Sequence, residues 1–265
     1  MKYPIGIQNF ESIITGNYVY VDKTALIYRL VTEGKIYFLS RPRRFGKSLL
    51  VSTLDAYFKG KKELFKGLAI DGLEKEWAEY PVFHLSFGGE NFIEQGALES
   101  KIGVALEKWE ELYGKSPIAT TFGGRFLHTL QAAHQKTGKR AVVLIDEYDK
   151  PLLDVLDTGM SVNVNGKERL QEEHHRNILK GFYSVFKEAD ASLQFVLLTG
   201  VTKFSQVSVF SGFNQPKDIS MDGRYEALCG ITEDELYQYF AAPIERLAAK
   251  YKYNTEQMKD KLKKQ

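Results

Sequence analysis

Residues 40–48 read SRPRRFGKS, and this stretch decides the fold. The mostly apolar run before it, residues 35–39, is typical of a short strand, and residues 49–58 after it carry apolar side chains at helical spacing. A strand, a tight Gly-Lys-Ser loop and a helix together form the setting of a phosphate-binding P-loop. The helix N-terminus offers unpaired N–H groups to an anion. In this setting Lys47 reaches the β- and γ-phosphates, and the Ser48 hydroxyl binds Mg²⁺.

The loop departs from the usual pattern at its start. The pattern G-x-x-x-x-G-K-[ST] requires glycine where this chain has Arg41, and Pro42 has no N–H with which to bind phosphate. The remaining donors lie later in the loop, where Arg43 and Arg44 add two charges with a geometry suited to phosphate oxygens. The predicted nucleotide-binding residues are Arg43, Arg44, Phe45, Gly46, Lys47, Ser48 and Leu49. From this loop alone, a basic turn that binds nothing remains an alternative.

A second motif, AVVLIDEYD at residues 141–149, lies well downstream. Its β-branched run followed by carboxylates is typical of a buried central strand with acids at its C-terminal end, where open α/β sheets bind ligands. As in a Walker B motif, Asp146 is predicted to hold Mg²⁺ through water and Glu147 to polarise the attacking water. Alone, these acids could simply cap a helix. Together with the P-loop, they favour nucleotide binding because the two motifs have complementary chemistry.

The next predicted strand, residues 193–199, ends in Thr199. This hydroxyl is expected to point at the γ-phosphate or the attacking water, and a satisfied strand-end hydroxyl is the alternative. The predicted catalytic residues are Glu147, Lys47 and Thr199, and the predicted metal ligands are Ser48 and Asp146.

Composition excludes several classes of protein. A formal net charge of +2 is too small to argue for nucleic acid or a membrane surface as partner. The single cysteine, Cys229, excludes an internal disulfide and fits a reducing compartment. No apolar run approaches the ~18 residues of a membrane helix, and the N-terminus lacks the pattern of a signal peptide. We therefore expect a cytoplasmic protein.

The segments between the motifs complete the expected fold. Residues 1–34 either cover one edge of the sheet or close over the nucleotide base, and both alternatives stay open. Helices predicted over residues 93–113 and 122–136 lie between strands, which favours crossover connections and a parallel sheet. The polar residues 158–167 predict a surface loop.

Two features nearer the C-terminus carry weaker signals. Glu172 and His175 have a spacing found in metal-binding bundles, but the second pair that such bundles need is missing, so we expect a solvated helix face. The capping box at residues 232–235 predicts a helix to about residue 251, and Thr255 is the predicted N-cap of a last helix.

Four segments of the chain resemble the AAA-ATPase-like family of prokaryotic proteins. They are YVDKT (20–24), RPRRFGKS (41–48), LIDEYDKP (144–151) and TGVTKFS (199–205). The resemblance implies that the absence of the first P-loop glycine is common in the family. It also implies phosphate and Mg²⁺ roles for Lys47 and Ser48, Walker B roles for Asp146 and Glu147, and a sensor-like role for Thr199. Members usually continue into a domain similar to PD-(D/E)XK nucleases, which these residues do not include.

We therefore expect an α/β P-loop NTPase of the additional-strand (AAA/STAND-like) kind. The predicted sheet order is 5-1-4-3-2, with helices on both faces. The five strands are expected near Ile36, Phe83, Val143, Val196 and Ile219. Residues 1–230 are expected to form the ATPase-like domain, and residues 231–265 the start of an incomplete helical lid.

The expected function is binding of ATP with Mg²⁺ and slow hydrolysis, coupled to a protein partner or a C-terminal domain. The alternative is a nucleotide-dependent switch or scaffold that does not hydrolyse. Glu147 favours the enzyme. The spacing of Arg224 and Arg246, the last two arginines, does not identify an arginine finger, which favours the switch. ATP is preferred to GTP on the family resemblance alone.

Overall fold

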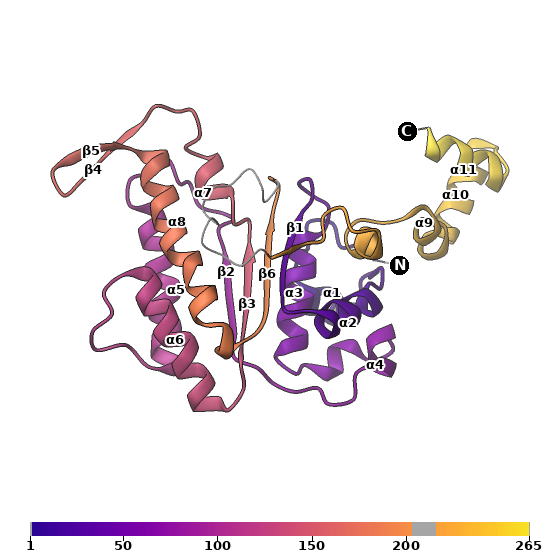
Figure 1. Cartoon of the computed structure of the whole chain (residues 1–265). Helices are drawn as coiled ribbons and strands as arrows, with labels where there is room; N and C mark the ends of the chain where they lie inside the picture. Colours follow the sequence, from indigo (N-terminus) through magenta and orange to yellow (C-terminus); the bar gives the residue numbers. More distant parts are fainter. Residues whose placement is uncertain (1, 203–215, 265) are drawn as a thin grey trace.

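The computed structural model describes residues 2–202 and 216–264. Its centre is a sheet of five parallel strands in the order β2-β3-β6-β1-β7 (Figure 1). The strands are β1 (Ile36–Ser40), β2 (Val82–Ser86), β3 (Ala141–Asp146), β6 (Leu193–Gly200) and β7 (Lys217–Asp218). The prediction of an α/β protein with a parallel sheet flanked by helices is confirmed.

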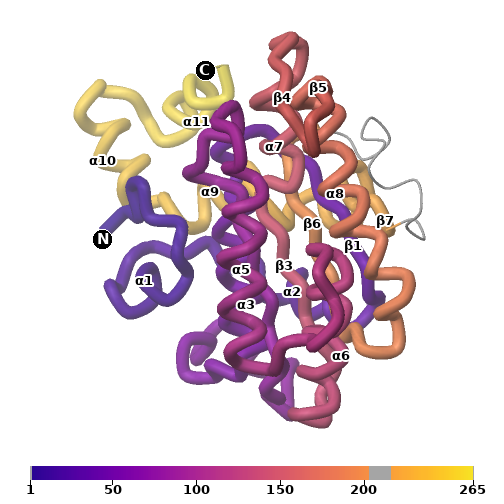
Figure 2. The backbone as a smooth tube through the Cα atoms, turned by 90° about the vertical axis from the view of Figure 1, so that its left-hand side faces the viewer, coloured from indigo at the N-terminus to yellow at the C-terminus, as the bar shows by residue number. Residues whose placement is uncertain are grey.

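Helices cover both faces of this sheet (Figures 1 and 2). The helices on one face are α5 (Ala97–Tyr113), α6 (Phe122–Thr137) and α8 (Gln171–Glu188). Those on the other are α1 (Phe10–Thr15), α2 (Thr24–Glu33), α3 (Lys47–Phe58) and α4 (Ala69–Leu73). Short helical turns η1 (Lys62–Phe65), α7 (Lys150–Leu153), η2 (Asp190–Ser192) and η5 (Gly223–Leu228) join the larger elements.

The strand β3 shows why the sheet is buried on both sides. All six of its residues are buried. Val143 and Ile145 belong to the core under α5, α6 and α8, whereas Val142 and Leu144 belong to the core under α1 to α4. Successive side chains of a strand point to opposite faces, so a continuous apolar run supplies both cores at once.

A β-hairpin replaces the surface loop that we expected over residues 158–167. Strands β4 (Ser161–Val164) and β5 (Lys167–Leu170) pair antiparallel and project from the body beside α7 and α8 (Figure 1). The turn residues Asn165 and Gly166 both have positive φ, 53° and 79°. Two-residue turns of this kind favour Asn-Gly because they require φ above zero at both positions. The prediction of a loop was wrong because polar composition alone does not distinguish a loop from an exposed hairpin.

The C-terminal helices α9 (Glu233–Tyr239), α10 (Ala241–Tyr251) and α11 (Thr255–Lys263) lie to one side of the sheet (Figure 1). The capping box between Thr232 and Glu235 is present, as predicted. The single helix expected to residue 251 is broken at Phe240, and the N-cap of α11 is Asn254 instead of Thr255. Ile244, Ala248 and Met258 form a small core of their own.

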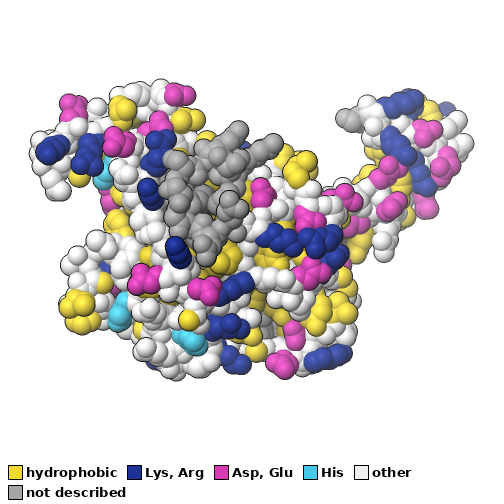
Figure 3. Space-filling view, viewed as in Figure 1, with side chains coloured by type: hydrophobic (Ala, Val, Ile, Leu, Met, Phe, Trp, Pro, Cys, Tyr) yellow, Lys and Arg dark blue, Asp and Glu magenta, His cyan; other side chains and the backbone are white. Residues whose placement is uncertain are grey.

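Side-chain charge on the surface is mixed in sign. On the face drawn in Figure 3, acidic and basic groups lie interspersed, in keeping with the formal net charge of +2. In the described part of the chain, no helix is both long enough and apolar enough to cross a bilayer.

Candidate functional site

The predicted motifs meet at the carboxyl edge of the sheet. Ser40 at the end of β1 is in register with Gly200 at the end of β6, and β6 in turn pairs with β3. The backbone continues this pairing beyond the strands, since Arg41 N donates to Gly200 O at 3.1 Å and Tyr148 N donates to Thr199 O at 3.0 Å. Because neighbouring parallel strands end together, the P-loop and the Asp-Glu pair face the same site.

Asp146 contacts two other predicted site residues directly. Its Oδ2 accepts a hydrogen bond from Ser48 Oγ at 2.6 Å, and its Oδ1 accepts one from Thr199 Oγ1 at 2.5 Å. Asp146 itself is only 4% exposed. The Thr199 hydroxyl therefore supports this carboxylate, and the expectation that it points at the γ-phosphate stays a prediction.

The Ser48 hydroxyl oxygen and the Asp146 carboxylate oxygen beside it suit the coordination of a Mg²⁺ ion. Mg²⁺ is usually held by one or two protein oxygens together with substrate phosphates and waters, and the Ser48 hydroxyl and the Asp146 carboxylate provide such oxygens side by side. Among residues 2–202 and 216–264, no group of three or more His, Cys, Asp or Glu side chains is placed to hold a metal. The donor set therefore suits an ion that the substrate helps to hold.

Lys47 is buried at the start of α3, where it is only 7% exposed. Its ammonium donates to the backbone oxygens of Arg41 at 2.8 Å and of Pro42 at 3.0 Å. Pro42 cannot donate to phosphate, but its carbonyl helps to position the lysine. An ammonium has three donors, so one remains for a further acceptor.

Arg41, which occupies the glycine position of the P-loop pattern, points away from the phosphate side. Its guanidinium donates to the carbonyl oxygens of Ser40 and Ser220, at the β7 edge of the sheet. The left-handed positions that the loop needs lie later instead, at Arg44 with φ of 67° and Gly46 with φ of 87°. The loop therefore turns without a glycine at its first position.

Glu147 has an unusual backbone and a perturbed carboxyl group. Its φ of 55° is rare for a residue with a side chain, and such conformations concentrate at functional sites. Burial raises the pKa of the Glu147 carboxyl and the Asp146 carboxylate raises it further, whereas nearby cations, led by Lys150, lower it. A raised pKa brings a carboxylate nearer to what a general base needs at neutral pH.

Asp149 is a site residue whose role the sequence analysis missed. It is 2% exposed, and its Oδ2 accepts from Val201 N at 2.9 Å, Thr202 N at 2.7 Å and Thr202 Oγ1 at 2.6 Å. A Cβ on Gly200 would meet Asp149 Oδ1 at 2.7 Å, so this close approach requires glycine. The carboxylate thus ties the acidic motif to the end of β6. The remaining residues of the resembling segment, 203–205, lie outside the described residues.

Two adjoining cavities open at this edge of the sheet. The first, of about 710 Å³, is polar where it meets the P-loop and the acidic motif, and it is lined by Arg43, Arg44, Lys47, Ser48, Glu147 and Lys150 among others. The second, of about 370 Å³, is mainly apolar and includes Tyr20, Leu50, Leu228, Cys229 and Phe240. Pro4, Ile13, Arg44, Gly46 and Leu49 line both. A ligand with a charged and an apolar end could therefore span them.

Residues 22 and 23 of the N-terminal segment contact α9 beside the apolar cavity. Lys23 forms a largely buried ion pair with Glu235 of α9. Tyr239 Oη accepts a hydrogen bond from the backbone N of Asp22 at 3.2 Å. The N-terminal segment therefore lines both cavities, and its closure over a nucleotide base stays a prediction.

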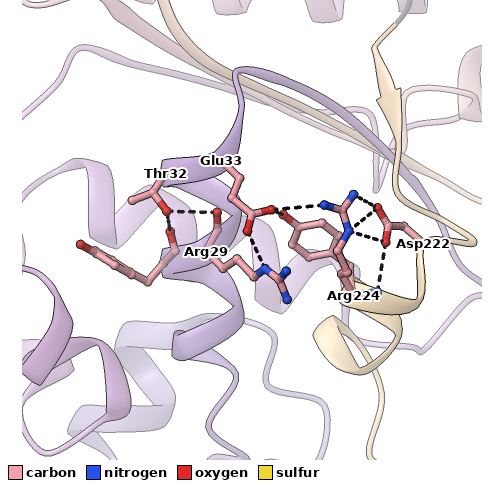
Figure 4. A network of polar contacts seen from close by, with 7 residues as sticks. Arg29, Thr32, Glu33, Asp222 and Arg224 are labelled. Carbon is pink, nitrogen blue, oxygen red and sulfur yellow. Dashed lines mark hydrogen bonds and ion pairs between the residues drawn. The ribbon is translucent and has the colours of Figure 1, made fainter.

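Two other predicted features lie away from this site. Figure 4 shows Arg224 bound to Asp222 and Glu33, and it lines neither cavity. His175 is 1% exposed, and its Nδ1 hydrogen-bonds Pro151 O at 2.8 Å. Burial lowers the pKa of His175. The expected solvated face was therefore wrong for this residue, which instead supports α7 directly after the acidic motif.

Comparisons with known proteins identify a family for this chain. A family model described as "Predicted AAA-ATPase" matches residues 4–210. The chain is also 44% identical over 245 residues to a protein of Azotobacter chroococcum mcd 1 named "Uncharacterized protein in vnfD 5'region". That match covers 92% of this chain and 45% of the relative, so the chain spans about half the length of the relative. No solved structure matches the chain. The extent of the family match shows that this chain belongs to the predicted AAA-ATPase family.

Proposed function

We propose that this chain binds ATP with Mg²⁺ and hydrolyses it slowly. The observation that carries the proposal is the Asp146 carboxylate, which holds the hydroxyls of Ser48 and Thr199 beside Lys47 and Glu147. Phosphate affinity, metal affinity and a general base are thereby combined at one sheet edge. The preference for ATP follows from the family description, since the cavity side chains do not by themselves separate ATP from GTP.

The strand order supports the additional-strand kind of P-loop fold. Counted along the chain without the hairpin, the five strands read 5-1-4-3-2 across the sheet. In this fold we assign residues 1–230 to the ATPase-like domain and residues 231–265 to a helical lid. A cytoplasmic location belongs to the same proposal.

We assign the phosphates to the polar cavity and the base to the apolar one. Lys47 and the N–H groups of residues 43–49 would hold the phosphates, and Ser48 and Asp146 would hold Mg²⁺. The ion would neutralise phosphate charge and orient the terminal phosphoryl group. Glu147 would accept the proton of the attacking water. The base would lie between α3 and the segment at residues 228–231, where apolar side chains line the cavity.

The nucleotide state would be read out through the lid. Gly230 N donates to Phe45 O at 2.9 Å, which ties the segment before α9 to the P-loop itself. A change in the loop on binding or hydrolysis would therefore reach the lid and, through it, a protein partner or a C-terminal domain. A switch that binds without hydrolysis is the second candidate, and it is favoured by Arg224 lying in a separate ion-pair network (Figure 4).

Titration calorimetry with ATP and Mg²⁺ tests the binding site. Lys47→Ala removes a buried charge worth roughly 1.5–3 kcal/mol to a charged acceptor, so we expect a loss of affinity of about tenfold to 10²-fold. Lys66→Ala is the matched control, because Lys66 is exposed and lines neither cavity. Equal affinities of the wild type and a folded Lys47→Ala variant would remove the P-loop assignment.

A further inference from the structure

Gln8 lies where two polar cavities meet. Besides the P-loop cavity, a cavity of about 460 Å³ is lined by Asp146, Ser86 and neighbouring residues. Three polar residues line both cavities, and they are Ser48, Glu147 and Gln8. The first two are the proposed Mg²⁺ ligand and general base. Gln8 therefore lies beside the two residues to which the proposed function assigns the reacting end of the nucleotide.

The segment that carries Gln8 is held against α3. Two residues further on, Phe10 is fully buried, and its backbone N donates to Ser52 Oγ at 2.9 Å. Ser52 lies one helical turn after Ser48. Before Gln8, the chain is fixed by Val19 N, which donates to Lys2 O at 2.8 Å. Residues 4–10 therefore pass over the start of α3 with both ends anchored.

The amide of Gln8 is available for a ligand, unlike that of its neighbour. Asn9 Oδ1 accepts from Ser12 N at 2.8 Å and from Ser12 Oγ at 2.9 Å, because it caps α1. Within the part of the chain that the structure describes, the exposed side chain of Gln8 has no such partner. A glutamine amide contains both a donor and an acceptor, so it can contact a phosphoryl oxygen and a water molecule together.

We propose that Gln8 positions the attacking water against the terminal phosphoryl group of ATP. This inference rests on the proposed function. In the reaction, the water oxygen bonds to the γ-phosphorus, the bond from that phosphorus to the β–γ bridging oxygen breaks, and ADP leaves with the electron pair. Glu147 takes the proton. Gln8 is the orienting group, a role that glutamine performs in other phosphate-hydrolysing enzymes without acting as the base.

Steady-state turnover and binding of ATP by three variants test the role. Gln8→Ala is expected to lower kcat by about tenfold to 10²-fold, the scale of lost positioning, with the Kd for ATP·Mg²⁺ and the melting temperature unchanged. Gln8→Glu places a negative charge at the phosphoryl group and is expected to weaken ATP binding more than ADP binding. Gln135→Ala, on an exposed site of α6, is the matched control and should behave as the wild type.

The outcomes separate this inference from the proposed function. An unchanged kcat in Gln8→Ala overturns the role of Gln8 and leaves ATP binding and hydrolysis standing. A fall of kcat together with a lower melting temperature or weaker binding identifies a structural role and also overturns it. Wild-type chain that binds ATP without turnover overturns both hydrolysis and the role of Gln8. Wild-type chain that does not bind ATP overturns the proposed function itself.

Discussion

The polar and apolar cavities lie side by side but are built in different ways. The charged residues of the polar cavity, Lys47 and Glu147 among them, come from two sequence motifs, and residues 4–13 complete its lining. The apolar cavity is assembled from residues 3–23, from the P-loop and the start of α3, and from the segment at residues 228–231. The charged groups therefore come from short motifs, whereas the shape of both cavities depends on segments that are far apart in the chain. Changes at Glu147, Cys229, Val19 and the pair Lys23 and Glu235 test the two cavities separately.

Glu147→Gln tests the polar cavity. The amide keeps the shape of the side chain but cannot accept the proton, so we expect turnover to fall by about 10²–10⁴-fold with ATP binding retained. Phosphate release and calorimetry on the same samples measure the two effects. Glu168→Gln on the exposed hairpin is the control. Loss of binding together with turnover would show that Glu147 is structural, and absence of turnover in the wild type would favour the switch.

The reactivity of Cys229 tests the apolar cavity. Burial raises the pKa of this thiol to about 11. Alkylation requires the thiolate, so at pH 8 the reaction should be about 10²-fold slower than with a free thiol and should accelerate about tenfold for each pH unit up to about 11. Iodoacetamide labelling followed by mass spectrometry gives the rate, with the urea-unfolded chain as reference. Binding of ATP should lower the labelling rate further. A labelling rate in the folded chain equal to that of the unfolded chain would contradict the burial of Cys229.

Val19→Trp distinguishes the contribution of the apolar cavity to ATP binding from that of the polar cavity. Val19 lines only the apolar one, and a larger side chain there should exclude the base. Loss of an apolar contact of roughly 1–3 kcal/mol lowers ATP affinity by about tenfold or more. Inorganic tripolyphosphate, which has no base, should compete for the polar cavity equally well in both proteins. Val104→Trp, at an exposed position of α5, is the control. Equal losses for both ligands would place the base elsewhere.

Variants of Lys23 and Glu235 test whether the lid closes the apolar cavity. Glu235→Gln removes the charge but keeps an oxygen for the capping box with Thr232. We expect either Lys23→Met or Glu235→Gln to speed nucleotide dissociation several-fold, with no further gain in the double variant, since coupled pairs interact by about 0.5–3 kcal/mol. Stopped-flow with a fluorescent ATP analogue gives the rates. Additive effects would show that the two residues act separately. The pair Glu256 and Lys259, whose side chains are 79% and 30% exposed, is the control.

Much of the fold could be predicted because its signals are local. The apolar run of β3 and the spacing of α3 each follow from residues within one element. The Asn165-Gly166 dipeptide is also a local signal, and it is typical of the two-residue turn that the hairpin contains. The break at Phe240 between α9 and α10 could not be predicted. The capping box marks the start of α9, and nothing in the sequence marks its end.

The candidate site divides in the same way. Lys47, Ser48, Asp146 and Glu147 could be named from motif chemistry. The anchoring role of Asp149 could not, since its partners Val201 and Thr202 are more than fifty residues away. The position of Gln8 could not be predicted either, because an isolated glutamine in a lead-in segment carries no periodic or motif signal.

The sequence by itself determined which groups can do chemistry, because a P-loop and an acidic strand end require particular residue types at short spacing. The tertiary structure decided what those groups face. It turned Arg41 away toward Ser220, directed Thr199 to Asp146, and brought residues 3–23 and residues 228–231 together beside α3. The physical reason is that side-chain direction and enclosure depend on packing between segments far apart in the chain. Such contacts form only when the whole core folds, and no short stretch records them.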